Sequence, residues 1–225
     1  AAAGWADMHA TDRMKVLYFW AENLTIHTDR FAEIIARGQN RSLKSGREEV
    51  ESACEMLVNY ASLCDKFEGR THSVPARMLG AALKEPIGIV AIKGPDDHPL
   101  LGVVGSIAPA VAMGNTVLYL AGLHSWAAME MIHVLQNSEI PAGVVNILSC
   151  EHPDDISKNS PLWTMATHEG VDALWYFGEG DGRKSVEALS ASNLKRTWAA
   201  DPRTMHWSSG ESRTVMKFLY EATQV

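Results

Sequence analysis

The second part of this chain alternates short β-branched runs with segments of helical length, and this alternation constrains the fold more than any other feature. Short runs that read as strands lie at 87–92, 115–120, 144–149, 173–177 and 195–198, and helices fit between them at 100–113, 125–136, 154–167 and 181–192. Parallel strands need such crossover helices, so the order predicts an α/β fold. We expect a mostly parallel sheet with helices on both faces.

The first 84 residues follow a different pattern. Apolar residues recur at steps of three and four between 11 and 37, which predicts one long amphipathic helix or two in series. A further helix is predicted over 45–67, with Ser45 as its N-cap and Glu48 at capping-box spacing. The stretch 70–84 is irregular and can form extended strands. We therefore expect helices within 1–69, a strand segment at 70–84, and the α/β domain at 85–225, which ends in a helix over 210–225.

The stretch from Pro99 to Leu123 carries no formal charge and is long enough to cross a bilayer. Glycines and prolines interrupt it, however, and the pair Gly114 and Asn115 is typical of a turn. The residues after this pair resemble a strand. The stretch therefore predicts a buried helix, a turn and a buried strand, and no membrane span.

Composition limits the partners and the compartment. The chain has 20 Lys and Arg against 27 Asp and Glu, a net charge of −7, so it lacks the basic excess of a nucleic-acid-binding protein. Its three cysteines, Cys54, Cys64 and Cys150, have no zinc or C-x-x-C spacing, which favours free thiols in a reducing, cytoplasmic compartment. Cys54 and Cys64 fall on the apolar face of a predicted helix, so we expect packed thiols there. We expect no metal site, because Gly170 breaks the helical spacing that would align His168 with a second ligand.

Four sequence motifs carry a family resemblance. They are EPIGIV at 85–90, P-x-x-x-P-L at 95–100, APAVAMGNTV at 108–117 and IPAGVVNI at 140–147. In their order and spacing they resemble the aldehyde dehydrogenase superfamily. The resemblance implies a Rossmann-like sheet, N-terminal helices, and oligomerisation strands at 70–84. The family's catalytic domain, which carries the cysteine nucleophile, is missing from this sequence, and the N-terminus reads as a fragment boundary.

The resemblance also marks where catalytic groups should lie. In the motif Pro95-Asp96-Asp97-His98-Pro99, Asp97 occupies the position of the side-chain amide that stabilises the family's oxyanion. An ionised carboxylate would repel that oxyanion, although a protonated one could still donate a hydrogen bond. Ala200 occupies the position of the general base, and Asp201 lies one residue too late to replace it. We therefore expect no intact catalytic residue.

The positions that hold the cofactor in the family are also altered. Leu120 and Leu123 stand where a lysine and usually a glutamate bind the adenosine ribose, and leucine can form neither contact. Gly178 and Glu179 stand in the turn that offers a hydroxyl to the pyrophosphate. A carboxylate at Glu179 would repel phosphate. We expect no cofactor for this stretch, while NAD(P) remains an expectation for a longer parent protein.

Loss of the chemical positions with survival of the fold-forming motifs is typical of a pseudoenzyme. Within the superfamily the chain most resembles the truncated second domain of aldehyde dehydrogenase family 16, which implies a role in assembly or scaffolding. The expected partner is a second copy or a companion aldehyde-dehydrogenase-like unit. Two alternatives stay open: a structural half of an NAD-dependent enzyme whose active unit lies elsewhere in the full chain, and a module that uses the altered cleft for another small molecule.

Overall fold

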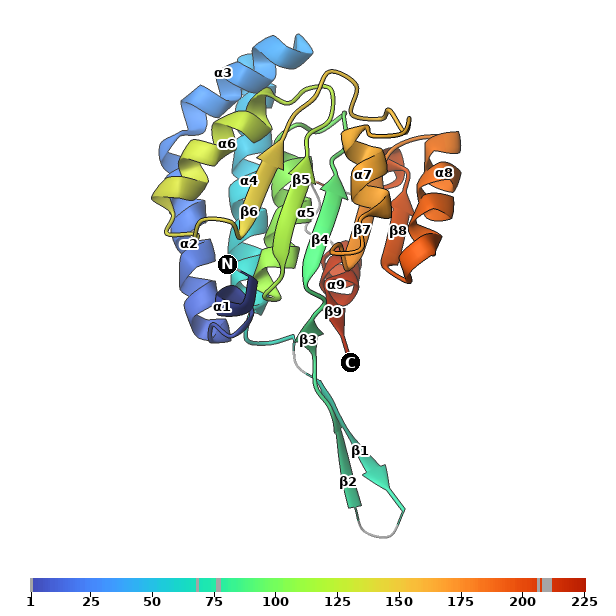
Figure 1. The fold of residues 1–225 in the computed structure, drawn as a ribbon. Helices are drawn as coiled ribbons and strands as arrows, with labels where there is room; N and C mark the ends of the chain where they lie inside the picture. Colours follow the sequence, from blue (N-terminus) through green and yellow to red (C-terminus); the bar gives the residue numbers. More distant parts are fainter. Residues whose placement is uncertain (1, 68, 76–77, 206, 208–211) are drawn as a thin grey trace.

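The computed structural model describes residues 2–67, 69–75, 78–205, 207 and 212–225 (Figure 1). The helices are α1 (Ala2–Ala6), α2 (Ala10–Ile26), α3 (Thr28–Gln39), α4 (Leu43–Leu63), α5 (Leu101–Ala112), α6 (Trp126–Asn137), α7 (Pro161–Thr167), α8 (Asp181–Ser190) and α9 (Ser212–Glu221). The strands are β1 (Arg70–Val74), β2 (Met78–Ala82), β3 (Glu85–Pro86), β4 (Ile89–Lys93), β5 (Thr116–Leu120), β6 (Val145–Leu148), β7 (Ala173–Phe177), β8 (Arg196–Ala200) and β9 (Thr223–Gln224).

Five strands form one parallel sheet in the order β6-β5-β4-β7-β8, which confirms the predicted sheet. The chain enters at the central strand β4, moves outward through β5 and β6, and then crosses back to β7 on the other side of β4. The strand order therefore reverses between β4 and β7. All five strands end at the same edge of the sheet, called the carboxyl edge below.

Helices cover both faces of the sheet, as the sequence predicts (Figure 1). On one face α5 and α6 pack with α2, α3 and α4 around the larger hydrophobic core. On the other face α7 and α8 enclose a smaller core. Strand β7 shows why the sheet is buried on both sides, because Trp175 and Phe177 enter the larger core while Leu174 and Tyr176 enter the smaller one.

A two-stranded hairpin projects from the opposite end of the molecule (Figure 1). Strands β1 and β2 pair antiparallel, with Arg70 opposite Ala82 and Val74 opposite Met78. The short strand β3 then pairs with β9 near the end of the chain and leads directly into β4. Extended strands are thus confirmed within 70–84, except at 76–77, which lie outside the described residues.

The uncharged stretch from Pro99 to Leu123 folds as predicted. Helix α5 is buried along its whole length, the chain turns at Gly114 with φ +88°, and β5 follows. The buried side chain of Asn115 fixes the turn, since it accepts the Gly88 N–H at 2.9 Å and donates to the carbonyls of Ala110 and Ala222 at 2.9 and 2.8 Å. Within the described part of the chain, no helix is long and apolar enough to span a membrane.

Two details of the N-terminal helices differ from or refine the prediction. The periodic stretch 11–37 forms two helices, α2 and α3, which meet at His27. The predicted N-cap at Ser45 is wrong, because α4 begins earlier and Ser42 caps it by accepting the Ser45 N–H at 3.1 Å. The hydroxyl of Ser45 instead accepts a hydrogen bond from Arg41 at 2.7 Å.

The helices predicted over 45–67, 154–167 and 210–225 extend beyond the observed ones, and α4 already ends at Leu63. In the range 154–167 only α7 is helical, because Asp155 accepts hydrogen bonds from the N–H and hydroxyl of Ser157 and Asn159 adopts φ +72°. These features produce turns, and the helix begins only after its N-cap, Ser160. At the other end of the range 210–225, the chain leaves α9 to form β9, and 210–211 lie outside the described residues.

Candidate functional site at the carboxyl edge

The candidate site lies at the point where the strand order of the sheet reverses. In open parallel sheets, ligands bind outside the carboxyl ends of the strands, at the point where the order reverses. Here that point lies between β4 and β7, and the loops that follow β4, β5, β6 and β7 meet there.

A buried lysine lies at this point. Lys93 ends β4, and its side chain has no exposed surface. Its Nζ lies 2.9 Å from Oδ1 of Asp154 and 3.5 Å from Oδ2 of Asp96, and it donates to the carbonyl oxygen of Phe177 at 3.5 Å. It also lies 5.9 Å from the ring centroid of Tyr176. We call Lys93, Asp96, Asp154 and Tyr176 the Lys93 cluster.

Tyr176 links the cluster to the glycine-rich turn before α8. Its Oη donates a hydrogen bond to Asp154 at 3.1 Å, and burial, together with the adjacent carboxylate, raises the pKa of its phenol. A Cβ atom on Gly178 or Gly182 would collide with the phenol group. The tyrosine ring therefore lies directly against the turn, and the missing side chains of these glycines leave the space that it fills.

Asp96 ties the loop after β4 to the loop after β5. Its Oδ1 accepts the N–H of Leu123 at 2.7 Å, and a Cβ on Gly122 would collide with the same oxygen. The side chain of Leu123 is exposed, whereas Leu120 is buried in the smaller core. Neither leucine side chain has a polar atom that could bind a ribose hydroxyl.

Charged residues also lie in the loops after β7 and β8, at the carboxyl edge. Arg203 lies 3.2 Å from Glu179 and 3.3 Å from Asp201, so it joins the turn after β7 to the end of β8. Hydrogen bonds from the side chain and backbone of Arg203 lower the pKa of Asp201, which makes that carboxylate a weaker base. Ala200, at the predicted base position, is nearly buried and presents only a methyl group.

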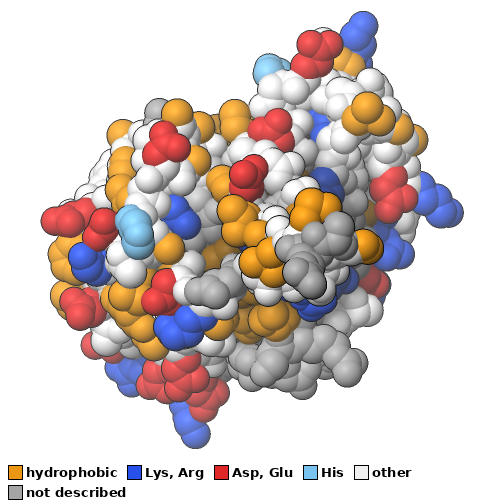
Figure 2. Space-filling view, turned by 90° about the horizontal axis from the view of Figure 1, so that it is seen from below, with side chains coloured by type: hydrophobic (Ala, Val, Ile, Leu, Met, Phe, Trp, Pro, Cys, Tyr) orange, Lys and Arg blue, Asp and Glu red, His pale blue; other side chains and the backbone are white. Residues whose placement is uncertain are grey.

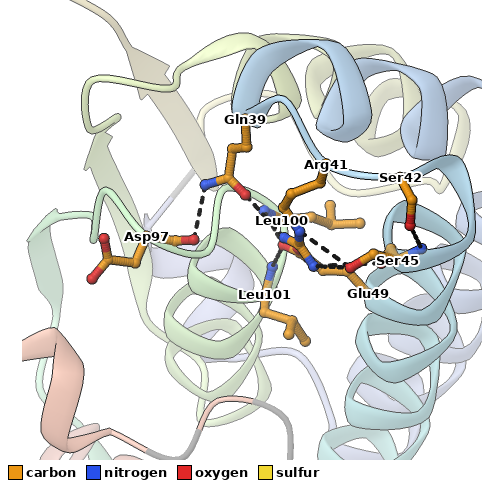
Figure 3. A network of polar contacts seen from close by, with 8 residues as sticks. All are labelled: Gln39, Arg41, Ser42, Ser45, Glu49, Asp97, Leu100 and Leu101. Atoms are coloured by element: carbon orange, nitrogen blue, oxygen red, sulfur yellow. Dashed lines mark hydrogen bonds and ion pairs between the residues drawn. The ribbon is translucent and has the colours of Figure 1, made fainter.

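The loop that carries Asp97 is held from the other side by the N-terminal helices (Figure 3). Glu49 of α4 is buried, and its Oε1 accepts the N–H groups of Leu100 and Leu101 at 3.1 and 3.3 Å, where α5 begins. Arg41 pairs with Glu49 at 2.5 Å. Gln39 donates to the backbone carbonyl of Asp97 at 2.9 Å, and the carboxylate of Asp97 points away from this network.

Other reactive side chains lie away from the carboxyl edge. The prediction of packed thiols is confirmed, since Cys64 is buried in the larger core and Cys54 packs against that core. Burial raises the pKa of Cys64 to about 12 and also raises the pKa of Cys54. Such thiols stay protonated near neutral pH and are poor nucleophiles. His168 accepts the N–H of Gly170 at its ring Nδ1, which closes a local turn.

The sequence reasoning did not single out the Lys93 cluster. A usable signal was present, because Lys93 ends the apolar run of a central strand that is buried on both faces. A lysine in that position must find carboxylates, since an unpaired buried charge is costly. The identity of those partners depends on loops that lie far apart in the sequence.

The sheet order and the helices on both faces define a Rossmann-like α/β protein, a class that commonly binds dinucleotides at this edge. A family model described as "Aldehyde dehydrogenase family" matches residues 1–200, and the chain belongs to this family. The chain is 34% identical over 194 residues to hydroxyisobutyraldehyde dehydrogenase of Mycolicibacterium austroafricanum. It is 27% identical over 196 residues to the chloroplastic betaine aldehyde dehydrogenase of Amaranthus hypochondriacus.

Solved structures show the same fold. An NAD-dependent aldehyde dehydrogenase from Sinorhizobium meliloti aligns with a TM-score of 0.82 at 20% identity, over 89% of this chain and 39% of that one. Betaine aldehyde dehydrogenase from Staphylococcus aureus, solved in complex with NAD+, aligns with a TM-score of 0.79 at 20% identity, over 88% of this chain and 38% of that one.

The match covers only part of each relative. The two sequence relatives align over 86% and 85% of this chain but over 37% and 38% of their own lengths. The chain thus corresponds to less than half of an aldehyde dehydrogenase.

Proposed function

We propose that this chain is a non-catalytic aldehyde-dehydrogenase-like unit whose role is assembly and scaffolding within a larger protein. The motifs that build the fold are present, whereas Asp97, Ala200, Leu120 and Glu179 replace the groups that the resemblance assigns to catalysis and cofactor binding. This combination most resembles the truncated second unit of aldehyde dehydrogenase family 16. On this proposal, 1–69 and 85–225 form the body and 70–84 forms the arm for association.

The observation that carries the proposal is the projecting hairpin. Met78, Leu79 and Leu83 are 60%, 76% and 68% exposed, on a ribbon that extends beyond the body. Figure 2, seen from the hairpin end, shows hydrophobic side chains gathered on this projection. A two-stranded ribbon is marginally stable alone, and its unpaired edges can template another strand. A partner surface that covers the hairpin would stabilise both its edges and its apolar side chains.

The test is the double variant Met78→Asp with Leu79→Asp, compared with the wild type by multi-angle light scattering. We expect the wild type to associate and the variant to dissociate at the same concentration, because two buried carboxylates would oppose the contact. Circular dichroism and thermal unfolding of the variant should match the wild type, since neither side chain belongs to the described core.

A matched control places aspartates at two other exposed apolar side chains, away from the hairpin. Ile26 and Trp126 are 75% and 68% exposed on α2 and α6. Ile26→Asp with Trp126→Asp should leave the association unchanged. The proposal is wrong if the wild-type protein is monomeric in its full-length form, or if the control disrupts association as much as the hairpin variant does.

The partial coverage of the relatives supports a second proposal for the parent protein. An upstream unit with an intact cysteine, glutamate and asparagine would oxidise aldehydes with NAD(P), and this chain would serve that unit structurally. Sequencing the full-length gene product distinguishes the two cases, because only the second requires those three residues.

A further inference from the structure

We propose that the Lys93 cluster is an internal plug that closes the dinucleotide crevice of this fold. This inference rests on the proposed non-catalytic function and adds the physical device that keeps a cofactor out. It follows from the positions of the buried lysine, the tyrosine and the two aspartates relative to the strand ends.

The first step concerns the place of the pyrophosphate. In dinucleotide-binding folds, the phosphates lie on a glycine turn at the N-terminus of a helix, where absent side chains let the ligand approach the backbone. Here the phenol of Tyr176 lies against both Gly178 and Gly182, at the start of α8. The protein's own side chain thus takes the space that the glycines leave free.

The second step concerns the hydrogen-bond donors. An ammonium group has three protons, and Nζ of Lys93 has three acceptors, on Asp154, Asp96 and Phe177. The N–H of Leu123, in the loop after β5, is already bonded to Asp96. These donors therefore have no proton left for a phosphate or a ribose.

The third step concerns charge at the mouth of the crevice. The side chains of Asp96 and Asp154 are 32% and 45% exposed, whereas Lys93 is fully covered, so the carboxylates form the outer surface. Glu179 adds a further carboxylate, and Arg203 is shared between Glu179 and Asp201. Phosphate would meet fixed negative charges at this surface, and the buried lysine is already neutralised.

The test first removes the charge of Glu179 and then, in that background, removes the ring of Tyr176. Isothermal calorimetry with ADP and with NAD would compare Glu179→Ser, Tyr176→Ala/Glu179→Ser, and the matched control Tyr176→Phe/Glu179→Ser. For Glu179→Ser and for the Phe control we expect Kd values of about 1 mM or weaker, because the ring still fills the turn. The Ala variant should bind ADP at least about tenfold more tightly, which is one decade in Kd.

Three results would overturn the plug. The first is that Glu179→Ser alone binds ADP as tightly as the Ala variant, since charge and not the ring would then exclude the ligand. The second is that the Ala variant folds but gains no affinity over the Phe control. The third is that the wild-type protein binds NAD with a micromolar Kd.

Hydrogen exchange on the wild-type protein covers the case in which the Ala variant does not fold. The plug requires slow exchange of the Leu123 amide that ADP leaves unchanged, and fast exchange there would contradict it. The association test is independent, because the Tyr176 and Glu179 variants should scatter light like the wild type. A failure of the plug and a failure of the assembly function would therefore be told apart.

Discussion

The side chains of the Lys93 cluster differ in their exposure to solvent. This difference determines how much each substitution there should lower the free energy of unfolding. Lys93 is completely buried, whereas Asp154 and Asp96 remain in contact with water. A carboxylate that loses its partner here can be solvated again, but the ammonium group cannot. The cost of breaking the pair should therefore depend on which partner is removed.

We predict that Asp154→Ala destabilises the protein more than Lys93→Met. Loss of Asp154 leaves the buried ammonium with the more distant Asp96 as its remaining carboxylate partner, at a cost of about 2 to 3 kcal/mol in the free energy of unfolding. Lys93→Met retains the volume and releases two solvated carboxylates, at a cost of about 1 kcal/mol or less. Urea unfolding of both variants measures the difference, and equal costs would contradict the asymmetry.

The catalytic positions give a second prediction at this scale. With Ala200 at the base position and Asp97 at the amide position, we expect no NAD-dependent aldehyde oxidation by this chain. NAD should bind no more tightly than about 1 mM, or about −4 kcal/mol. An absorbance assay for NADH and calorimetry check both points, and turnover that follows the purified protein through successive columns would refute the first.

Among the elements, α5 shows how distant segments stabilise one helix. Leu100, at its N-cap position, has no polar side chain, and no side-chain cap bond forms there. Glu49 supplies the missing acceptor from α4, and its charge also interacts favourably with the positive end of the helix. The helix that leads away from the candidate site is thus capped by a residue about fifty positions earlier.

We predict that Glu49→Ala lowers the free energy of unfolding by about 3 kcal/mol, because it leaves two buried N–H groups without their acceptor and removes the carboxylate that pairs with Arg41. Glu48→Ala is the matched control, since this neighbouring carboxylate is largely exposed and only pairs with Lys44 at 3.9 Å. The control should change stability by less than about 0.5 kcal/mol. Thermal and urea unfolding measure both, and similar effects would show that Glu49 does not cap α5.

At the scale of the whole molecule, aromatic residues seal one face of the sheet. Trp198 packs edge to face with Trp175, Phe177 and Phe218 of α9, and Trp175 also packs edge to face with Phe218. Trp207 contacts the same group and lies close to Gly105 of α5. The segment after β8 therefore covers the sheet with its own side chains and joins the outer strands to α5.

Buried tyrosines should make the whole molecule sensitive to alkali. Burial raises the pKa of Tyr60, Tyr119 and Tyr176 above the ordinary value near 10. As the pH rises, these phenols ionise in the unfolded chain before they ionise in the folded protein. Their contribution to the free energy of unfolding is therefore complete below pH 10 and is lost above it, by up to about 1.4 kcal/mol per pH unit for each tyrosine. Urea unfolding at pH 9 to 11 should show a smaller decline for Tyr119→Phe than for the wild type. An identical decline would contradict this assignment.

The sequence alone determined the parallel sheet, the layers of helices and the five strands of that sheet, because local periodicity and buried apolar runs encode them. The family resemblance also marked Leu120 and Ala200, which end β5 and β8, and Asp97 and Glu179, which lie in the loops after β4 and β7. Only the tertiary structure decided how the carboxyl edge is filled. The contacts of Lys93 with Asp154 and Phe177 join residues 61 and 84 positions away, and the turns at 154–160 that free Asp154 arise from side-chain hydrogen bonds that compete with a helix. Such partners depend on the three-dimensional meeting of loops, which no local pattern records.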